Sequence, residues 1–139
     1  MRFALPEHRK RVYATGFAIR WGDMDALGHV NNANYFRYME TCRIDWLTSA
    51  CGGVSRDGGN TLVVNAFCNF HRELAYPGEL RLTLYTSNVG RSSYENWVTI
   101  ERADQPGLIH ADGGATMVWV DAASGRAAPL PDWLRAQVA

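Results

Sequence analysis

The sequence predicts an α+β fold in which one long central helix is wrapped by a curved antiparallel sheet of about five strands. Three observations support this class. Residues 13–21 alternate as in a strand, residues 34–50 have helical periodicity, and residues 61–121 contain only strand patterns separated by short turns. Strands that follow one another across short turns pair antiparallel, so a single helix interrupts an otherwise antiparallel sheet.

The first predicted strand covers residues 13–21. Its larger side chains recur with a period of two and would share one face of the sheet: Tyr13, Thr15, Phe17 and Ile19. The residues that follow, GDMDALGHVNN, are rich in Gly, Asp and Asn and predict a loop. That loop ends at Asn31 and Asn32, either of which can cap a helix by accepting a hydrogen bond from a free backbone N–H.

The predicted helix runs from Asn34 to Ala50. Its apolar positions recur at spacings of three and four: Tyr35, Phe36, Met39, Cys42, Trp46, Leu47 and Ala50. Because this face is wide and rich in aromatic rings, we expect other parts of the structure to enclose most of the helix. The glycine pair at residues 52–53 suits the left-handed conformation that ends a helix. Glu40 and Arg43 lie three residues apart and are expected to form an ion pair.

Four further strands are predicted after the helix, at residues 61–70, at 80–85, at 94–101 and in the segment that ends at Asp121. The turns between them contain Gly, Pro or both, and a short terminal helix can begin after Pro131. One helix covers only one face of a sheet. The other face or the sheet edge therefore needs a partner, and we expect a homodimer.

Composition narrows the class of protein. The 139 residues suit one domain that spans residues 1–139, and 14 basic and 14 acidic side chains give zero net charge, so a nucleic-acid binder is not expected. No run of about 18 apolar residues could span a membrane, and the N-terminal residues lack the apolar centre of a signal peptide. The three cysteines lack metal-ligand spacing, so we expect reduced thiols in a cytoplasmic protein.

The candidate chemistry lies in the loop before the helix, where Asp23, Asp25, His29 and two asparagines precede the helix N-terminus. The free N–H groups and the positive dipole end of a helix favour negative charge, including an oxyanion formed from a carbonyl group. A carboxylate beside that position could attack the carbonyl or activate a water molecule. The combination indicates acyl transfer.

Simpler interpretations of the loop remain open, since Asp and Asn before a helix commonly act as caps and turn formers. A calcium loop is rejected, because Leu27 and Asn34 occupy positions that need other residues. A metal held by the two aspartates and His29 would lack a ligand from elsewhere, and we expect neither a metal nor a cofactor. Cys42 lies on the apolar helix face, so a nucleophilic pair with His29 is not expected.

The string DMDALGHVNNANYFRYMETCR resembles the signature of the hotdog-fold thioesterases related to 4-hydroxybenzoyl-CoA thioesterase. It is also similar to the DxDxxxHVNN segment of acyl-carrier-protein thioesterases. The resemblance extends over the whole chain, up to the final segment MVWVDAASGRAAPLPDWL. It implies an acyl-CoA thioesterase with the hotdog fold, which acts as a homodimer and often pairs further into a homotetramer.

By position in the motif, the resemblance implies that Asp25 is the nucleophile or general base at the thioester carbonyl. The backbone N–H near Asn32 would polarise that carbonyl, and His29 would accompany Asp25 or orient the loop. This chain carries Leu27 where the acyl-carrier-protein enzymes carry an asparagine. Asp23 is expected to be structural, with its side chain bound to loop amides.

The resemblance also places the pantetheine arm of the substrate in a tunnel at the dimer interface. The acyl pocket would be lined by Tyr35 and Met39 of the helix and by strand residues from Val63 to Phe67. Candidate contacts for the phosphates of CoA lie at strand ends or turns: Arg72, Arg91 and Ser92.

Three other functions remain open from the sequence alone. They are an acyl-carrier-protein thioesterase, a hotdog hydratase or dehydratase, and a non-catalytic protein that binds acyl-CoA. The loop resembles the thioesterase type more than the hydratase type. Retention of Asp25 within the full motif favours catalysis over binding alone.

Overall fold

The structure is a computed structural model that describes residues 3–139. Six antiparallel strands form one sheet in the order β1-β4-β5-β6-β3-β2. The strands are β1 (Lys10–Ala18), β2 (Ser55–Arg56), β3 (Gly59–Phe70), β4 (Glu79–Ser87), β5 (Ser93–Arg102) and β6 (Ile109–Asp121). The helices are α1 (Asn32–Ala50), α2 (Asp132–Val138) and the short 3-10 helix η1 (Trp21–Asp23). None of the helices within residues 3–139 is long and apolar enough to cross a lipid bilayer.

The predicted α+β class is confirmed, with six strands where about five were expected. The additional strand, β2, has only two residues and pairs with the first two residues of β3. The other four strands after the helix lie where the alternating pattern predicts them, and α2 begins directly after Pro131 as expected.

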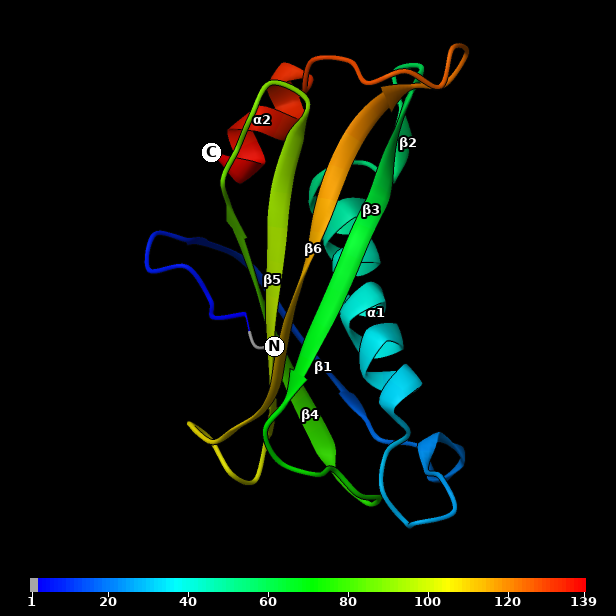
Figure 1. Ribbon diagram of the computed structural model, residues 1–139, viewed down its shortest axis with the longest axis vertical. Coiled ribbons are helices and arrows are strands. Elements are labelled where there is room, and N and C mark those ends of the chain that lie inside the picture. Colours follow the sequence, from blue (N-terminus) through cyan, green and yellow to red (C-terminus); the bar gives the residue numbers. More distant parts are fainter. Residues whose placement is uncertain (1–2) are drawn as a thin grey trace.

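The hydrophobic core lies between α1 and one face of the sheet. Figure 1 shows α1 running along the sheet, with the loop of residues 19–31 at one end of the molecule and α2 at the other. Alternate residues of the central strands point towards the helix and are almost fully buried, among them Leu80, Leu82, Leu84, Val98 and Ile100. Trp46 of α1 packs edge-on against Tyr94 of β5, with ring centroids 6.2 Å apart.

The first strand ends earlier than predicted, at Ala18 instead of Trp21, although Phe17 and Ile19 face the core as expected. The Asp23 carboxylate accepts a hydrogen bond from the backbone N–H of Arg20, at 2.9 Å, and draws the chain into η1. Helix α1 begins two residues earlier than predicted, because Asn31 caps it through a 2.9 Å bond from the Ala33 N–H.

The buried face of α1 differs from the predicted face at four positions. Phe36 and Ala50 are exposed, whereas Tyr38 and Arg43 are buried. The expected ion pair between Glu40 and Arg43 is not formed. Among the ion pairs within residues 3–139, none joins a carboxylate oxygen of Glu40 to a guanidinium nitrogen of Arg43 within 4.0 Å. The helix therefore leaves one stripe uncovered within a single chain, in contrast to the expectation that it is mostly enclosed.

Candidate active site

The loop before α1 is organised by Asp23. Its carboxylate accepts hydrogen bonds from the Tyr38 hydroxyl at 2.7 Å and from the Arg20 N–H at 2.9 Å. Its carbonyl accepts from the Asn31 N–H at 3.0 Å and from the Asn34 side-chain amide at 2.7 Å. Burial raises the pKa of Tyr38 well above its usual range, and the bond to Asp23 raises it further, so the hydroxyl remains a donor. These contacts agree with the structural role expected for Asp23.

Asp25 lies in a tight turn that fixes one of its two carboxylate oxygens. The Asp25 N–H donates to the His29 carbonyl at 2.8 Å, and the Gly28 N–H donates to the Asp25 carbonyl at 3.1 Å. Gly28 has a φ of 80°, which favours glycine. The Asp25 Oδ1 atom accepts from the Leu27 N–H at 2.9 Å and from the His29 N–H at 3.5 Å. Within residues 3–139 nothing donates to Oδ2, so this oxygen remains available.

The first turn of α1 also offers a free donor. Asn31 satisfies the N–H groups of Ala33 and Asn34 through its side chain and its carbonyl, at 2.9 Å each. No group among the residues described accepts from the Asn32 N–H. This N–H therefore points out of the helix N-terminus, where the dipole is positive.

Asp25 opens onto a hollow of about 360 Å³, here called the Asp25 hollow. It is lined by Asp25, Leu27, His29, Val30, Asn32, Tyr35, Phe70, His71, Arg72 and Glu73. Tyr35 closes its inner end, where the ring packs edge-on against Phe70 with centroids 4.9 Å apart and the hydroxyl accepts from the Leu74 N–H at 3.2 Å. Five of the residues predicted for the site thus meet in one hollow: Asp25, His29, Asn32, Tyr35 and Arg72.

The prediction missed Glu73, which lies 2.9 Å from the Nε2 atom of His29. Both side chains are partly exposed at the rim of the Asp25 hollow. The contact fixes the orientation of the imidazole ring. The two residues are 44 positions apart, and only the pairing of β3 with the sheet brings them together, so no local pattern could have indicated this contact.

Met39 and Val63 lie on the helix side of the sheet but outside the Asp25 hollow. Met39 is buried, with its sulfur close to Gly113 of β6. Val63 lines a separate hollow of about 340 Å³ between α1 and β3. Neither side chain lines the Asp25 hollow within one chain.

Phe67 lies on the opposite face of the sheet, away from α1. Its ring packs against Phe3 and Trp97, with centroids 4.6 and 5.2 Å apart. A bulge between Val63 and Asn65 inserts one residue into β3 and reverses the faces that follow. As a result Phe67 does not share the face of Val63, and the structure does not bring it to Asp25.

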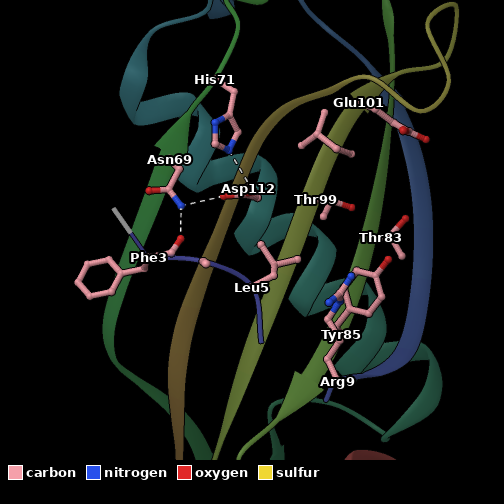
Figure 2. A pocket seen from close by; sticks show the side chains of 12 residues that line it. Phe3, Leu5, Arg9, Asn69, His71, Thr83, Tyr85, Thr99, Glu101 and Asp112 are labelled. Atoms are coloured by element: carbon pink, nitrogen blue, oxygen red, sulfur yellow. Dashed lines mark hydrogen bonds and ion pairs between the residues drawn. The ribbon is translucent and has the colours of Figure 1, made fainter. Parts of the chain in front are cut away.

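The outer face of the sheet carries a second hollow, of about 480 Å³, shown in Figure 2. The N-terminal segment crosses it, and Asp112 binds both His71, at 3.0 Å, and the Asn69 amide, at 2.8 Å. His71 lines both this outer hollow and the Asp25 hollow. The contact between Asp112 and His71 thus braces the segment that carries Arg72 and Glu73.

Arg91 and Ser92 lie in the turn before β5, at the end of the molecule that holds α2. The carbonyl of Arg91 accepts from the Leu130 N–H, and that of Ser92 accepts from the Trp119 N–H, both at 2.8 Å. One chain does not bring these residues to the Asp25 hollow, and their contact with phosphates stays a prediction.

The Asp25 hollow is lined by two acidic residues and two histidines and by no cysteine. Within residues 3–139, no three His, Cys, Asp or Glu side chains are arranged to hold a metal ion. The three cysteines are free thiols, and Cys42 is fully buried. Burial raises the pKa of Cys42 to about 12, so its thiol is protonated at neutral pH and cannot serve as a nucleophile.

Residues 19–138 match the family model of the thioesterase-like superfamily. The chain belongs to this superfamily. The match covers every residue that lines the Asp25 hollow, together with α1 and all strands of the sheet except β1.

Solved structures agree with the superfamily assignment. The PA2801 protein of Pseudomonas aeruginosa, a proposed thioesterase, is 28% identical with a TM-score of 0.87, covering 94% of this chain and 100% of its own. A proposed acyl-CoA thioesterase from Xanthomonas campestris is 31% identical with a TM-score of 0.74, covering 81% and 95% of the two chains. A thioesterase from Thermus thermophilus, complexed with coenzyme A and zinc, is 29% identical with a TM-score of 0.74, covering 89% and 94%.

This member of the thioesterase-like superfamily is therefore a thioester hydrolase with the hotdog fold, as the sequence motif implied. The curled antiparallel sheet and the central helix are the shared architecture.

Proposed function

We propose that the protein hydrolyses acyl-CoA thioesters to a free acid and CoA, with Asp25 as the nucleophile or general base. The observation that carries the proposal is that the free Oδ2 atom of Asp25 and the open N–H of Asn32 belong to residues that line one hollow. Two of the similar solved proteins are described as an acyl-CoA thioesterase and as a complex with coenzyme A, which supports CoA as the carrier.

In the proposed reaction, the thioester carbonyl oxygen accepts a hydrogen bond from the Asn32 N–H. As the tetrahedral intermediate forms, the helix dipole and this N–H stabilise the negative oxygen. The carbon–sulfur bond then breaks, and the CoA thiolate leaves and takes up a proton.

Asp25 can begin the reaction in two ways. As a general base, Oδ2 takes a proton from water while the water oxygen attacks the carbonyl carbon. As a nucleophile, Oδ2 attacks directly and forms a mixed anhydride, which water then hydrolyses. In both cases the Leu27 N–H holds Oδ1 and fixes the direction of the free oxygen.

His29 and Arg72 would serve the substrate from the rim. The contact with Glu73 holds the His29 ring at the edge of the Asp25 hollow, where the ring can orient the loop or assist the proton transfer. Arg72 is exposed and lines the same hollow, which suits a contact with a CoA phosphate.

We also place the working protein in a homodimer joined through β3. Strand β2 covers the first two residues of β3, and the Thr61 N–H donates to the Val54 carbonyl at 2.9 Å, so residues 62–70 have a free edge. Leu62, Val63 and Val64 on this edge are each about half exposed, and Phe36 and Ile44 of α1 lie exposed as well. A free apolar edge of this length is commonly covered in the working protein. Further pairing into a homotetramer stays a prediction, as does the reducing, cytoplasmic setting that the free thiols suit.

A substrate panel tests the proposed function. Short, long and aromatic acyl-CoAs, an acyl-carrier-protein thioester and an enoyl-CoA are incubated with the enzyme, and thiol release and hydration are measured. Thiol release from at least one acyl-CoA is expected. Three other outcomes would replace the proposal. Thiol release only from the carrier-bound substrate would indicate an acyl-carrier-protein thioesterase, and hydration of the enoyl-CoA would indicate a hydratase. Thermal stabilisation by acyl-CoA without thiol release would indicate a binding protein.

A further inference from the structure

The middle of α1 carries an arginine that is largely buried and has no charged partner within one chain. Arg43 is 8% exposed, yet no hydrogen bond or ion pair to its side chain occurs within residues 3–139. Burial lowers the pKa of Arg43, and the nearby Glu40 carboxylate offsets this in part. The guanidinium nitrogens are not fully enclosed and reach the open hollow beside α1, where a carboxylate outside the single chain could pair with them.

Arg43 and Glu40 line the same open hollow between α1 and β3, together with Phe36, Val63 and Ala66. They lie one helical turn apart and do not pair with each other. The hollow opens on the uncovered stripe of α1 and on the exposed part of β3. It therefore presents two positive groups, Arg37 and Arg43, and one negative group, Glu40, on a face that is otherwise apolar.

The free edge of β3 fixes where a second copy of the chain would place its own hollow. If the free part of β3, residues 62–70, pairs antiparallel with itself about a central twofold axis, the axis passes near its midpoint, Ala66. Val63 and Ala66, which line the hollow, lie at or near that point. The two α1 helices would then run antiparallel past each other at the level of Glu40 and Arg43. A twofold contact is reciprocal, so a pair made by one copy is made again by the other.

We propose that Arg43 pairs with Glu40 of a second copy of this chain, and that Glu40 pairs with Arg43 of the same copy. The two ion pairs fix the register in which the copies join, while the exposed apolar residues around them supply the contact area. This inference rests on the proposed dimer and is independent of the proposed hydrolysis.

Charge reversal with mixing tests the pairs. Arg43→Glu places two acids in contact across the axis, and Glu40→Arg places two bases there, so each variant alone is expected to dimerise at least about 100-fold more weakly than wild type. A mixture of the two variants restores both opposite-charge pairs. Sedimentation is therefore expected to show one-to-one heterodimers with an affinity close to that of the wild-type dimer.

The outcomes separate the parts of the inference. A monomeric wild type would overturn the proposed dimer and these pairs together, whatever the thioesterase assay gives. If the wild type is dimeric, two results would overturn the ion pairs alone. One is that each single variant dimerises as tightly as wild type, and the other is that the mixed variants associate no more tightly than either variant alone. An ion pair between Glu40 and Arg43 of the same chain predicts that mixing gives no gain in affinity, because mixing two variants cannot restore an intrachain pair.

Two controls protect the test. Arg37→Glu makes the same charge change in the same hollow, so equal recovery when it is mixed with Glu40→Arg would show general attraction and contradict the assigned pairs. If Arg43→Glu does not fold by circular dichroism, the Glu40→Cys and Arg43→Cys chains replace the charge reversals. When these two chains are mixed and oxidised, a disulfide-linked heterodimer is expected. If the mixture gives no more disulfide-linked dimer than either chain gives alone, the proposal is overturned.

Discussion

The Asp25 carboxylate has one oxygen fixed by the Leu27 N–H and one oxygen that no other group holds within residues 3–139. A carboxylate acting as a cap needs only the first contact, whereas a general base or nucleophile needs the second oxygen to be free and aimed. Asp23, two residues earlier, has both its carboxylate and its carbonyl engaged by neighbours. The two aspartates of this loop thus have different hydrogen-bond environments, and only Asp25 has the free oxygen that the proposed reaction needs.

Removing the charge of Glu73 should lower activity without unfolding the protein. Glu73→Gln is expected to reduce kcat up to about tenfold, because the His29 ring loses the carboxylate that orients it. The pair is partly exposed, so the free energy of unfolding should change by no more than about 1 kcal/mol. Glu79→Gln, an exposed substitution on β4 outside the Asp25 hollow, is the matched control. Wild-type kcat in the Glu73 variant would rule out the positioning role.

Stability should fall in alkali because of the buried thiols. Burial raises the pKa of Cys42 to about 12, whereas the unfolded thiol titrates near 8.5. The contribution of this pKa difference to the free energy of unfolding is complete below the pKa of the unfolded thiol. It is lost as the pH rises towards 12, because the unfolded chain releases the thiol proton first. Urea unfolding between pH 8 and 11 should show a decline of up to about 1.4 kcal/mol per pH unit from this thiol. Cys42→Ala should flatten the slope, and identical slopes would refute the assignment.

At the residue scale, sequence could locate Asp25 because its motif is local and its position before a helix has a physical meaning. Tyr35 was also predictable from its place in the first turns of that helix. Glu73 was not, since its contact with His29 depends on how β3 ends beside the loop. Phe67 was expected on the wrong face, because a single-residue bulge in β3 leaves no clear trace in the alternation of side chains.

At the scale of elements, α1 approaches the sheet closely at Gly113 of β6. A Cβ atom there would lie 2.7 Å from the Met39 sulfur and would also collide with the Phe67 carbonyl oxygen. The helix that carries the Asn32 N–H and the strand β3 that leads to Glu73 both meet at this point. The absence of a side chain at Gly113 therefore sets the depth at which α1 packs.

Gly113→Ala should destabilise the protein by about 1–3 kcal/mol, because the methyl group forces α1 or β3 to shift. Thermal or urea unfolding measures the effect. Gly22→Ala is the control, since a Cβ atom at Gly22 meets nothing within 4 Å and should change stability by about 0.5 kcal/mol or less. Equal stability of the two variants would show that the helix packs less closely than the structure indicates.

At the scale of the whole molecule, one helix covers one face of the sheet and leaves β3 with a free apolar edge. The order of elements alone predicts a partner, because a lone helix cannot enclose a sheet of this size, and the dimer itself stays a prediction. The outward-facing stripe of α1 could not be inferred from the sequence, because helical periodicity placed the exposed Phe36 on the buried face. The same uncovered stripe carries Glu40 and Arg43, whose charges we assign to the contact between two copies.

The central claim is that the Asp25 carboxylate drives thioester hydrolysis, and one substitution tests it most directly. Asp25→Asn keeps an oxygen that can accept from the Leu27 N–H, so the loop should retain its shape while the base or nucleophile is lost. With the best acyl-CoA substrate, kcat is expected to fall by about 10² to 10⁴ relative to wild type, with unchanged folding by circular dichroism. A folded Asp25→Asn variant with kcat close to that of wild type would contradict the account.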